Sequence, residues 1–297
     1  MKAIFSRNQH FSDPVLGHAG LNKAGLHLLR LQLASGCFGW RRLVHYAWAH
    51  RQALRQLRRD GYVVLPNFLP DAEFSLLQQE IRQKIAAVDS QTPMKFFNEH
   101  GFGKKHFFSG GFDRFDGNTL NRFYEIQPED TALSALAHSE RLLSLFSCLA
   151  GVAAKPQQLS LYKVVHGAGQ DNPDIQKDWH RDTFQPALKM WYFTEDVTAE
   201  HGPFAYIPGS HRLTKARLAW EYRQSVDAAK RKAGGSFRID EQEVCQLYKQ
   251  QPKLMTVPAN SLVLADIRGF HRRGDGKANA ERVSLYANFR PHPFKVW

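Results

Sequence analysis

The sequence predicts a mainly β protein with flanking helices, built as an antiparallel sandwich or barrel. Short strand-like runs dominate from residue 158 onward, separated by Gly, Pro and Asn turns. Helical patterns precede them, and a charged, helix-like insertion interrupts them at about 212–250. Many short strands after helices favour one sheet-based domain, and 297 residues leave room for additions to it.

Residues 1–59 are expected to form a basic, partly helical N-terminal extension. The first 60 residues hold ten Lys and Arg against Asp13 and Asp60, so they carry most of the net charge of +12. Apolar residues recur at helical spacing from Trp40 to Leu57, with arginines between them, which predicts a basic amphipathic helix. It would either dock on the core with a solvated basic face, or contact an anionic membrane surface or anionic substrate.

The segment 60–297 is expected to be the main domain. It opens with "DGYVVLPNFL" at 60–69, a strand-like run that ends in a turn, and a helix is expected from Pro70. The segment 95–124 places aromatic residues among glycines without a clean period. We expect a core-covering loop or a substrate-facing wall there.

Six later runs predict strands, and one run inside the insertion predicts a helix. The strand-like runs are "QLSLYKVV", "ALKMWYFT", "PFAYIP", "KLMTV", "SLVLAD" and "RVSLYANF". The helix-like run is "RLAWEYRQSVDAAKRKA".

The stretch "DWHRDTF" contains the first candidate ligands, His180 and Asp182. Residues two apart on a strand face the same side, so both side chains could converge on a metal ion. A lone motif of this kind also fits a strand-end turn in which Asp182 caps a neighbouring amide. A third candidate, His271, follows a strand-like run, and two imidazoles with one carboxylate form the facial triad of non-haem Fe(II) oxygenases.

Arg282 and Ser284 open the next strand-like run after His271. The planar guanidinium of an arginine matches a carboxylate with two parallel hydrogen bonds. Ser284 lies two residues further on and shares the face of Arg282, so it could add a hydrogen bond.

The order of these residues resembles the phytanoyl-CoA dioxygenase family of Fe(II)/2-oxoglutarate-dependent oxygenases. The resemblance runs from about residue 60 to 291 and rests on "DGYVVLPNFL", His-x-Asp, "GPFAYIPGSHR", a distant His and then Arg. It implies a double-stranded β-helix, also called a jelly roll and cupin-like. It also implies that His180, Asp182 and His271 are both the metal ligands and the catalytic residues.

The resemblance further implies Fe(II), 2-oxoglutarate as co-substrate, and O2. Arg282, with Ser284, would hold the distal carboxylate of 2-oxoglutarate, which is decarboxylated to succinate while an unactivated C–H bond is hydroxylated. Because Asp182 is retained, hydroxylation is favoured over halogenation. The residues expected to flank the co-substrate are Tyr162, Lys163, Thr183 and Trp191, although an aromatic residue or lysine on a half-buried strand also fits the core or the surface.

Two other histidines compete as ligands. His211 lies in the "PGSHR" turn, where the family has a histidine that is usually structural, and His201 precedes "GPF". We expect neither to bind the metal.

The substrate is expected to be a small molecule or a lipid-linked molecule, and the sequence does not identify it. Alternatives are a hydroxylase of nucleic acid or protein and a non-catalytic jelly-roll binding protein. Three widely spaced cysteines and the lack of a secretory signal or long apolar run indicate a cytoplasmic protein, in peripheral contact with the inner face of the membrane if residues 1–59 bind anionic lipid. Deleting residues 1–59 is expected to leave the metal site intact.

Overall fold

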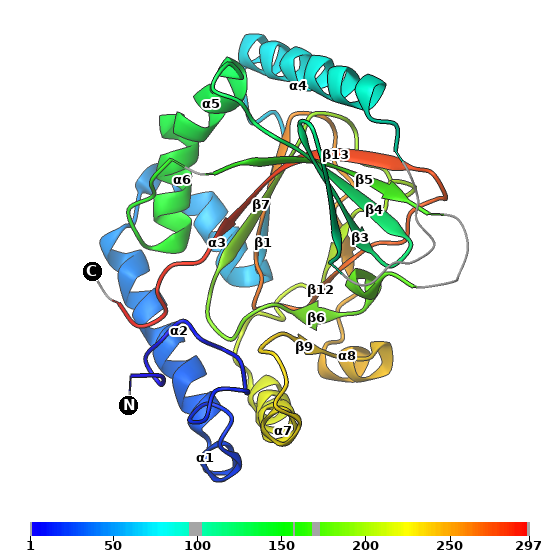
Figure 1. Ribbon diagram of the computed structural model, residues 1–297. Helices are drawn as coiled ribbons and strands as arrows, with labels where there is room; N and C mark the ends of the chain where they lie inside the picture. The colour runs from blue at the N-terminus through cyan, green and yellow to red at the C-terminus, as the bar shows by residue number, and fades with distance from the viewer. Residues whose placement is uncertain (1, 95–102, 157, 168–172, 296–297) are drawn as a thin grey trace.

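Two antiparallel sheets form the centre of the molecule (Figure 1). The computed structural model describes residues 2–94, 103–156, 158–167 and 173–295. The larger sheet has eight strands, in the order β1 (Tyr62–Leu65), β11 (Ser261–Asp266), β7 (Leu188–Phe193), β13 (Glu281–Phe289), β5 (Ser160–His166), β4 (Thr119–Tyr124), β3 (Gly111–Asp116) and β2 (Lys105–Phe108). The smaller has five, in the order β10 (Lys253–Leu254), β8 (Phe204–Tyr206), β12 (His271–Arg273), β6 (His180–Arg181) and β9 (Phe237–Arg238). The predicted jelly roll is confirmed.

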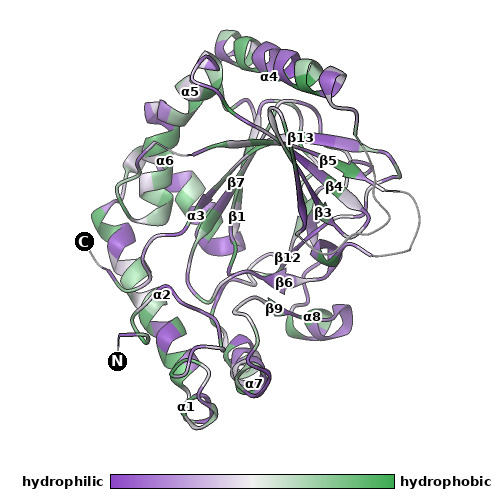
Figure 2. Ribbon diagram, viewed as in Figure 1, coloured by the Kyte–Doolittle hydropathy of each residue, from purple (hydrophilic) through white to green (hydrophobic). Residues whose placement is uncertain are grey.

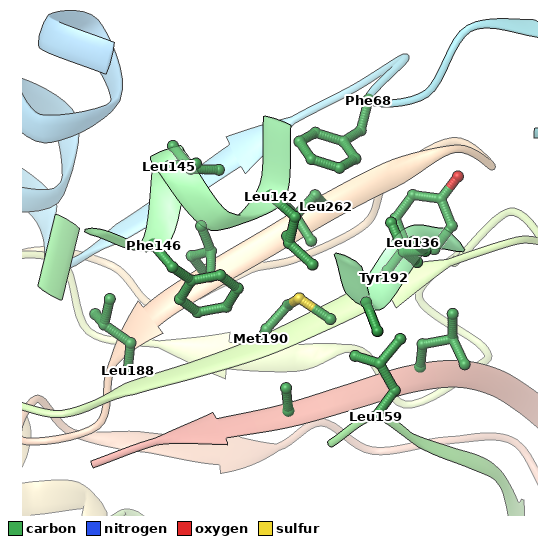
Figure 3. Close-up of a cluster of buried hydrophobic side chains, with 14 of the residues drawn as sticks. Phe68, Leu136, Leu142, Leu145, Phe146, Leu159, Leu188, Met190, Tyr192 and Leu262 are labelled. Atoms are coloured by element: carbon green, nitrogen blue, oxygen red, sulfur yellow. The ribbon is translucent and has the colours of Figure 1, made fainter. Parts of the chain in front are cut away.

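The alternation of side chains along β7 shows how the larger sheet separates two cores. Met190 and Tyr192 are buried on the outer face, in a cluster with residues of the covering helices (Figure 3). Trp191 and Phe193 point the other way and pack with Phe204 of the smaller sheet. Four helices contribute to the outer cluster: α3 (Arg51–Asp60), α4 (Asp71–Gln91), α5 (Thr131–His138) and α6 (Glu140–Ala150). The period of two therefore directs alternate residues of β7 toward the space between the sheets.

The insertion at 212–250 contains two helices, and α7 covers the smaller sheet. These are α7 (Lys215–Arg231) and α8 (Glu241–Leu247). Trp220 of α7 is fully buried and packs edge-on against Phe270, which directly precedes His271. The insertion thus supports the strand that carries one candidate ligand.

A buried ionic cluster joins α7 to β6. Glu221 accepts hydrogen bonds from Arg181 at 2.8 Å and Arg217 at 2.9 Å, and its carboxylate lies 2.9 Å from His27. Arg181 lies between His180 and Asp182, so its side chain points to the opposite side of the strand. Pairing Arg181 with Glu221 fixes the strand with its two candidate ligands facing inward.

The N-terminal extension differs from the expected single amphipathic helix. It contains α1 (Ala19–Lys23), α2 (Leu26–Val44), η1 (Trp48–His50) and the start of α3. The chain is not helical at 45–47, and the expected faces are reversed near the end of α2. Arg41 and Arg42 are buried, whereas Trp40, Leu43 and Val44 are exposed.

Tertiary hydrogen bonds explain this reversal. Arg41 donates to the carbonyl oxygens of His292 and Lys295, at 2.6 and 2.8 Å, and Arg42 donates to that of Leu149 at 2.8 Å. Near the N-terminus, Gln9 donates to the carbonyl oxygen of Asp182 at 3.0 Å. These contacts disagree with the expectation that residues 1–59 can be removed without effect on the metal site.

Of the two expectations for the aromatic and glycine-rich segment at 95–124, the loop is wrong for the described residues, whereas the substrate-facing wall stays a prediction. Residues 95–102 lie outside the described part, but the remainder forms the antiparallel strands β2, β3 and β4 instead of a loop. Gly110 and Gly117 have positive φ values of 95° and 64°, which glycine adopts without strain, and they form the two hairpin turns. The strands extend the larger sheet beyond β5.

Candidate metal centre

The three predicted ligands meet between the two sheets. His180 on β6 is opposite His271 on β12 in the strand register, and Asp182 follows β6. Nε2 of His180 lies 3.6 Å from Oδ1 of Asp182, and Nε2 of His271 lies 3.7 Å from Oδ2. One donor atom from each residue lies within 4.8 Å of the other two. Two imidazoles and one carboxylate therefore present three donors to one point.

Backbone carbonyls orient both imidazoles. Nδ1 of His180 donates to the carbonyl oxygen of Asp178 at 2.7 Å, and Nδ1 of His271 donates to that of Gly269 at 2.9 Å. Each Nε2 is then left with its lone pair. Nε2 of His271 is buried and has no hydrogen-bond partner, so the donor set fits a bound metal ion.

Gly269 allows the turn before His271 to pack closely. A Cβ atom built on Gly269 would lie 1.8 Å from the hydroxyl of Tyr206, which donates to the carbonyl oxygen of Asp266. The residue must therefore lack a side chain for its carbonyl to reach His271.

The charges around the site favour the metal-binding protonation states. Burial, together with the neighbouring imidazole of His271, lowers the pKa of His180 to about 3. Burial alone would raise the pKa of Asp182, but the ammonium group of Lys189 and the imidazole of His271 hold it well below its ordinary value. Nζ of Lys189 lies 2.5 Å from Oδ2 of Asp182. At neutral pH, Asp182 is therefore ionised and His180 is neutral, as metal coordination requires.

Arg282 and Ser284 lie on one face of β13, the face that is directed toward the space between the two sheets. The guanidinium of Arg282 donates through Nη1 to the carbonyl oxygen of Gly202, while its buried Nε has no partner. The hydroxyl of Ser284 is also buried without a partner. Burial lowers the pKa of Arg282 to about 10, so the group remains charged at neutral pH. Unsatisfied donors beside a charged guanidinium suit a carboxylate ligand.

The four residues expected near the co-substrate divide into two pairs. Tyr162 and Trp191 line the cavity of about 310 Å³ that contains the three candidate ligands, and Nε1 of Trp191 donates to the hydroxyl of Tyr162 at 3.1 Å. Lys163 lies outside this lining, because the residue after Tyr162 faces the other side of β5, and its ammonium group lies 2.6 Å from Asp89 of α4. Thr183 also lies outside the lining and accepts a hydrogen bond from the backbone of Gln185 at 3.4 Å.

The cavity also contains basic residues that were not expected. Lys189, Arg273 and Arg290 line it, and Nη2 of Arg290 lies 3.8 Å from Oδ2 of Asp182. The sequence contains a signal for two of them, since Lys189 is two residues before Trp191 and Arg273 is two after His271. Because alternate residues of a strand share a face, Lys189 lies on the cavity side with Trp191, and Arg273 lies there with His271.

The two rival histidines lie away from the donor set. Nε2 of His211 contacts the carbonyl oxygen of Arg58 at 3.2 Å, and Nδ1 of His201 accepts a hydrogen bond from the backbone of Thr198 at 3.1 Å. Among the described residues, the metal-binding group consists of His180, Asp182 and His271.

A comparison with protein families identifies the class of this protein. The model of the phytanoyl-CoA dioxygenase (PhyH) family matches residues 57–277. This chain belongs to that family. The match includes all three candidate ligands and ends before Arg282, so the placement of the guanidinium in the cavity is an independent observation.

Curated relatives match part of the chain. Phytanoyl-CoA dioxygenase domain-containing protein 1 of Rattus norvegicus is 23% identical over 186 residues, and the Bos taurus protein of the same name is 24% identical over 187. Each match covers 53% of this chain and 64% of the relative. The chain thus spans less than two thirds of the length of these relatives.

Solved structures share the fold. A structure of the epimerase SnoN in complex with Fe3+, alpha ketoglutarate and nogalamycin RO has a TM-score of 0.50, with 20% identity over 82% of this chain and 87% of SnoN. A structure of EctD from S. alaskensis with 2-oxoglutarate and 5-hydroxyectoine also has a TM-score of 0.50, with 19% identity over 85% of this chain and 84% of EctD.

Proposed function

We propose that this chain is an Fe(II)/2-oxoglutarate-dependent dioxygenase that hydroxylates an unactivated C–H bond of a small-molecule or lipid-linked substrate. The observation that carries this proposal is the convergence of His180, Asp182 and His271 on a cavity that also contains the guanidinium of Arg282. Family membership supports it. The ligands named for SnoN and EctD support the choice of iron and 2-oxoglutarate.

The residues of the chain would hold each component in turn. The Nε2 atoms of both histidines and the carboxylate of Asp182 would bind Fe(II) on one side and leave its other side open. Arg282 would pair with the distal carboxylate of 2-oxoglutarate, and Ser284 would add a hydrogen bond. When bound, Fe(II) would activate O2, so that one oxygen atom oxidises 2-oxoglutarate to succinate and CO2 and the other enters the C–H bond. The sheet walls would exclude bulk water from the cavity.

Hydroxylation is the part of the proposal that depends on the substrate. The fold is shared with an epimerase, and a fold does not determine the reaction. The carboxylate of Asp182 supports hydroxylation, because it would be the third ligand of the metal, in the place that a halide would otherwise need.

The test is O2 consumption and succinate formation by protein purified without oxygen and supplied with Fe(II) and 2-oxoglutarate. We expect both to require both additions, and to be lost in His180→Ala, Asp182→Ala and His271→Ala. A screen of candidate substrates for products heavier by one oxygen atom then tests hydroxylation. A hit confined to nucleic acid or protein would support the alternative hydroxylase, and absence of Fe(II) binding would support the non-catalytic binding protein.

A further inference from the structure

An excess of positive charge surrounds the candidate metal centre. Asp182 is the acidic residue that lines its cavity, against six basic residues within the described part of the chain: Arg114, Lys189, Arg272, Arg273, Arg282 and Arg290. Two buried carboxylates behind the lining balance part of this charge: Asp174 and Asp116 both pair with Arg273, and Asp116 also pairs with Arg114. Fe(II) and doubly charged 2-oxoglutarate would cancel each other, so the cavity would remain positive after both bind.

An aromatic surface leads outward from this cavity along β5, β4, β3 and β2. The rings of Tyr162 and Phe123 stack with centroids 5.3 Å apart, and those of Phe123 and Phe112 stack at 4.7 Å. The ring of Phe107 lies 5.6 Å from that of Phe112 and is 77% exposed. We call these four residues the aromatic platform. Burying the outermost ring would have been favourable, so its exposure suits contact with a ligand.

Two cations lie against the platform. Nζ of Lys105 is 4.5 Å from the ring centroid of Phe112, and the guanidinium carbon of Arg114 is 5.3 Å from that of Phe123. Nε of Arg114 is buried without a hydrogen-bond partner, although Nη2 pairs with Asp116. A ligand on the platform would thus meet flat apolar surface and unsatisfied positive charge together.

We propose that the substrate joins an anionic group to a flat or apolar body, and that this body lies on the aromatic platform with the anion beside Lys105 and Arg114. The inference rests on the proposed function for the identity of the cavity as an active site. It goes beyond that function by naming the chemical class of the substrate and the strands that bind it.

The test compares two matched probes, 1-naphthyl phosphate and neutral 1-naphthol, by calorimetry. Full-length protein is loaded with Mn(II) and saturating 2-oxoglutarate, and the titrations are repeated without either. We expect the phosphate to bind about tenfold or more tightly than the alcohol. Lys105→Gln, at an exposed position, should reduce this preference about two- to fivefold. Phe107→Ala should weaken both probes, whereas the control Lys253→Gln, at an exposed position of β10, should change neither.

Equal affinity for the two probes, or an equal effect of Lys253→Gln and Lys105→Gln, would overturn the inference. The titration of 2-oxoglutarate into the Mn(II)-loaded protein is a separate measurement. If 2-oxoglutarate binds but the phosphate is not preferred, the substrate class is wrong and the proposed function stands. If 2-oxoglutarate does not bind, the proposed function fails, and the titrations without it still decide whether the platform prefers anions.

A second, independent observation concerns the surface of α2. All its basic residues are buried, so this 19-residue helix exposes no charged side chain. Its exposed apolar residues follow helical spacing, and Figure 2 shows hydrophobic residues along its length. We call them the α2 apolar face: Leu29, Leu33, Trp40, Leu43 and Val44, which are 40–66% exposed. Contiguous exposed apolar surface of this kind marks an interaction site.

The surroundings of this face are aromatic and basic. Tyr46 and Trp48 directly follow α2 and are exposed, and Arg51 lies 4.6 Å from the ring centroid of Trp48. Arg55 and Arg58 of α3 are exposed as well. No acidic residue occurs between Asp13 and Asp60 in the sequence, so a second copy of this chain would bring like charges together.

We infer that the α2 apolar face docks on an anionic membrane surface, with Trp40, Tyr46 and Trp48 at the interface and the arginines of α3 near the lipid headgroups. Apolar area, interfacial aromatic residues and nearby basic residues are the features that peripheral membrane helices combine. Within the described residues, no helix is long and apolar enough to cross a bilayer. We expect α2 to bind in the plane of the membrane surface, as peripheral amphipathic helices do.

Vesicle co-sedimentation tests this inference with the full-length protein. We expect binding to phosphatidylcholine vesicles that contain phosphatidylglycerol, much weaker binding to phosphatidylcholine alone, and loss of binding at high salt. Trp40→Ser combined with Leu43→Ser should weaken binding about tenfold or more. Leu76→Ser, which removes a residue that is 64% exposed on α4, is the matched control and should leave binding unchanged.

Three outcomes would overturn the membrane inference. The first is failure to bind the anionic vesicles at low salt, and the second is an equal effect of the control and the double variant. The third is a different occupant: a dimer that the double variant dissociates, or binding of duplex or single-stranded nucleic acid in the same buffer without binding of vesicles.

Discussion

Arg282 and Lys163 are both basic and nearly buried, but they lie on opposite faces of the larger sheet. Arg282 faces the cavity with an unsatisfied Nε, whereas Lys163 pairs with Asp89 of α4. We expect Arg282→Lys to weaken 2-oxoglutarate binding about ten- to a hundredfold, because an ammonium group cannot replace the two parallel hydrogen bonds of a guanidinium. Calorimetric titration of the Mn(II)-loaded protein measures this change.

Lys163→Gln is the matched control for this prediction. It should lower the free energy of unfolding, because it leaves Asp89 with fewer partners, and it should leave the affinity for 2-oxoglutarate unchanged. Unchanged affinity in Arg282→Lys, or a loss in Lys163→Gln as large as in Arg282→Lys, would place the co-substrate elsewhere.

The sequence predicts the three candidate ligands that the fold brings together, but Lys163 and Thr183, also expected near the co-substrate, lie outside the lining of the cavity. His180 and Asp182 were found because residues two apart on a strand share a face. His271 was found because it follows a strand-like run, in the order of residues that the family shows. Tyr162 and Lys163 are consecutive residues of one regular strand, so their side chains cannot both face the cavity. Lys189 was missed although it lies two residues before Trp191 and shares its face, because its ion pair with Asp182 joins two different sheets and forms only in the folded chain.

Helix α7 acts on the site through Glu221, whose carboxylate is fully buried among two arginines and His27. Removing one partner of a buried ion pair leaves uncompensated charge, so Glu221→Gln should lower the free energy of unfolding by about 3–5 kcal/mol. Denaturant titration at neutral pH measures the change. A loss below about 1 kcal/mol, typical of exposed pairs, would contradict the structural role of the cluster.

The same cluster predicts how stability depends on pH. Burial lowers the pKa of His27, so its neutral form is favoured in the folded state, and stability decreases as the pH falls below the unfolded value of about 6.5. Burial alone would raise the pKa of Glu221, but Arg181 and Arg217 hold it well below its ordinary value. Its contribution is complete above the unfolded value of about 4.3 and is lost as the pH falls through the folded value.

Two variants separate these contributions in unfolding curves recorded from pH 8 to pH 3. Relative to the wild type, His27→Gln should flatten the dependence that begins below about pH 6.5, and Glu221→Gln should flatten the dependence that begins below about pH 4.3. Parallel curves for all three proteins would show that neither group is coupled to folding.

Elements with regular periods were predicted better than elements defined by tertiary contacts. The strand from Tyr62 and the helix after Pro70 have clear patterns and occur as expected. Strands β2, β3 and β4 were missed because their pairing depends on glycine turns and on buried polar pairs such as Arg122 with Asp113. In α2 the hydrophobic pattern gave the wrong buried face, because carbonyl oxygens of distant segments bind Arg41 and Arg42.

The N-terminal extension and the barrel pack together as one folded unit. Leu31 of α2 is fully buried in a cluster with Phe184, two residues after Asp182. Leu31→Ala should therefore lower the free energy of unfolding by about 2–5 kcal/mol, whereas Leu33→Ala, 40% exposed on the same helix, should change it by less than about 0.5 kcal/mol. Equal, small effects in both variants would mean that the extension is not part of the folded core.

The boundary between the extension and the main domain stays a prediction, because the contacts cross it. His27, Gln9 and Arg42 each bind residues of the barrel or its helices. A sequence reveals the basic composition of the first 60 residues, but the burial of Arg41 and Arg42 depends on carbonyl groups more than 100 residues away.

In the proposed enzyme, His180, Asp182 and His271 bind Fe(II) while Arg282 holds 2-oxoglutarate beside it. The most direct test is the visible charge-transfer absorption that appears when Fe(II) and 2-oxoglutarate chelate at one site without O2. We expect this band in the wild type and in His211→Ala, and its absence in His271→Ala. No band in the wild type, or a band that survives in His271→Ala and is lost in His211→Ala, would contradict the claim.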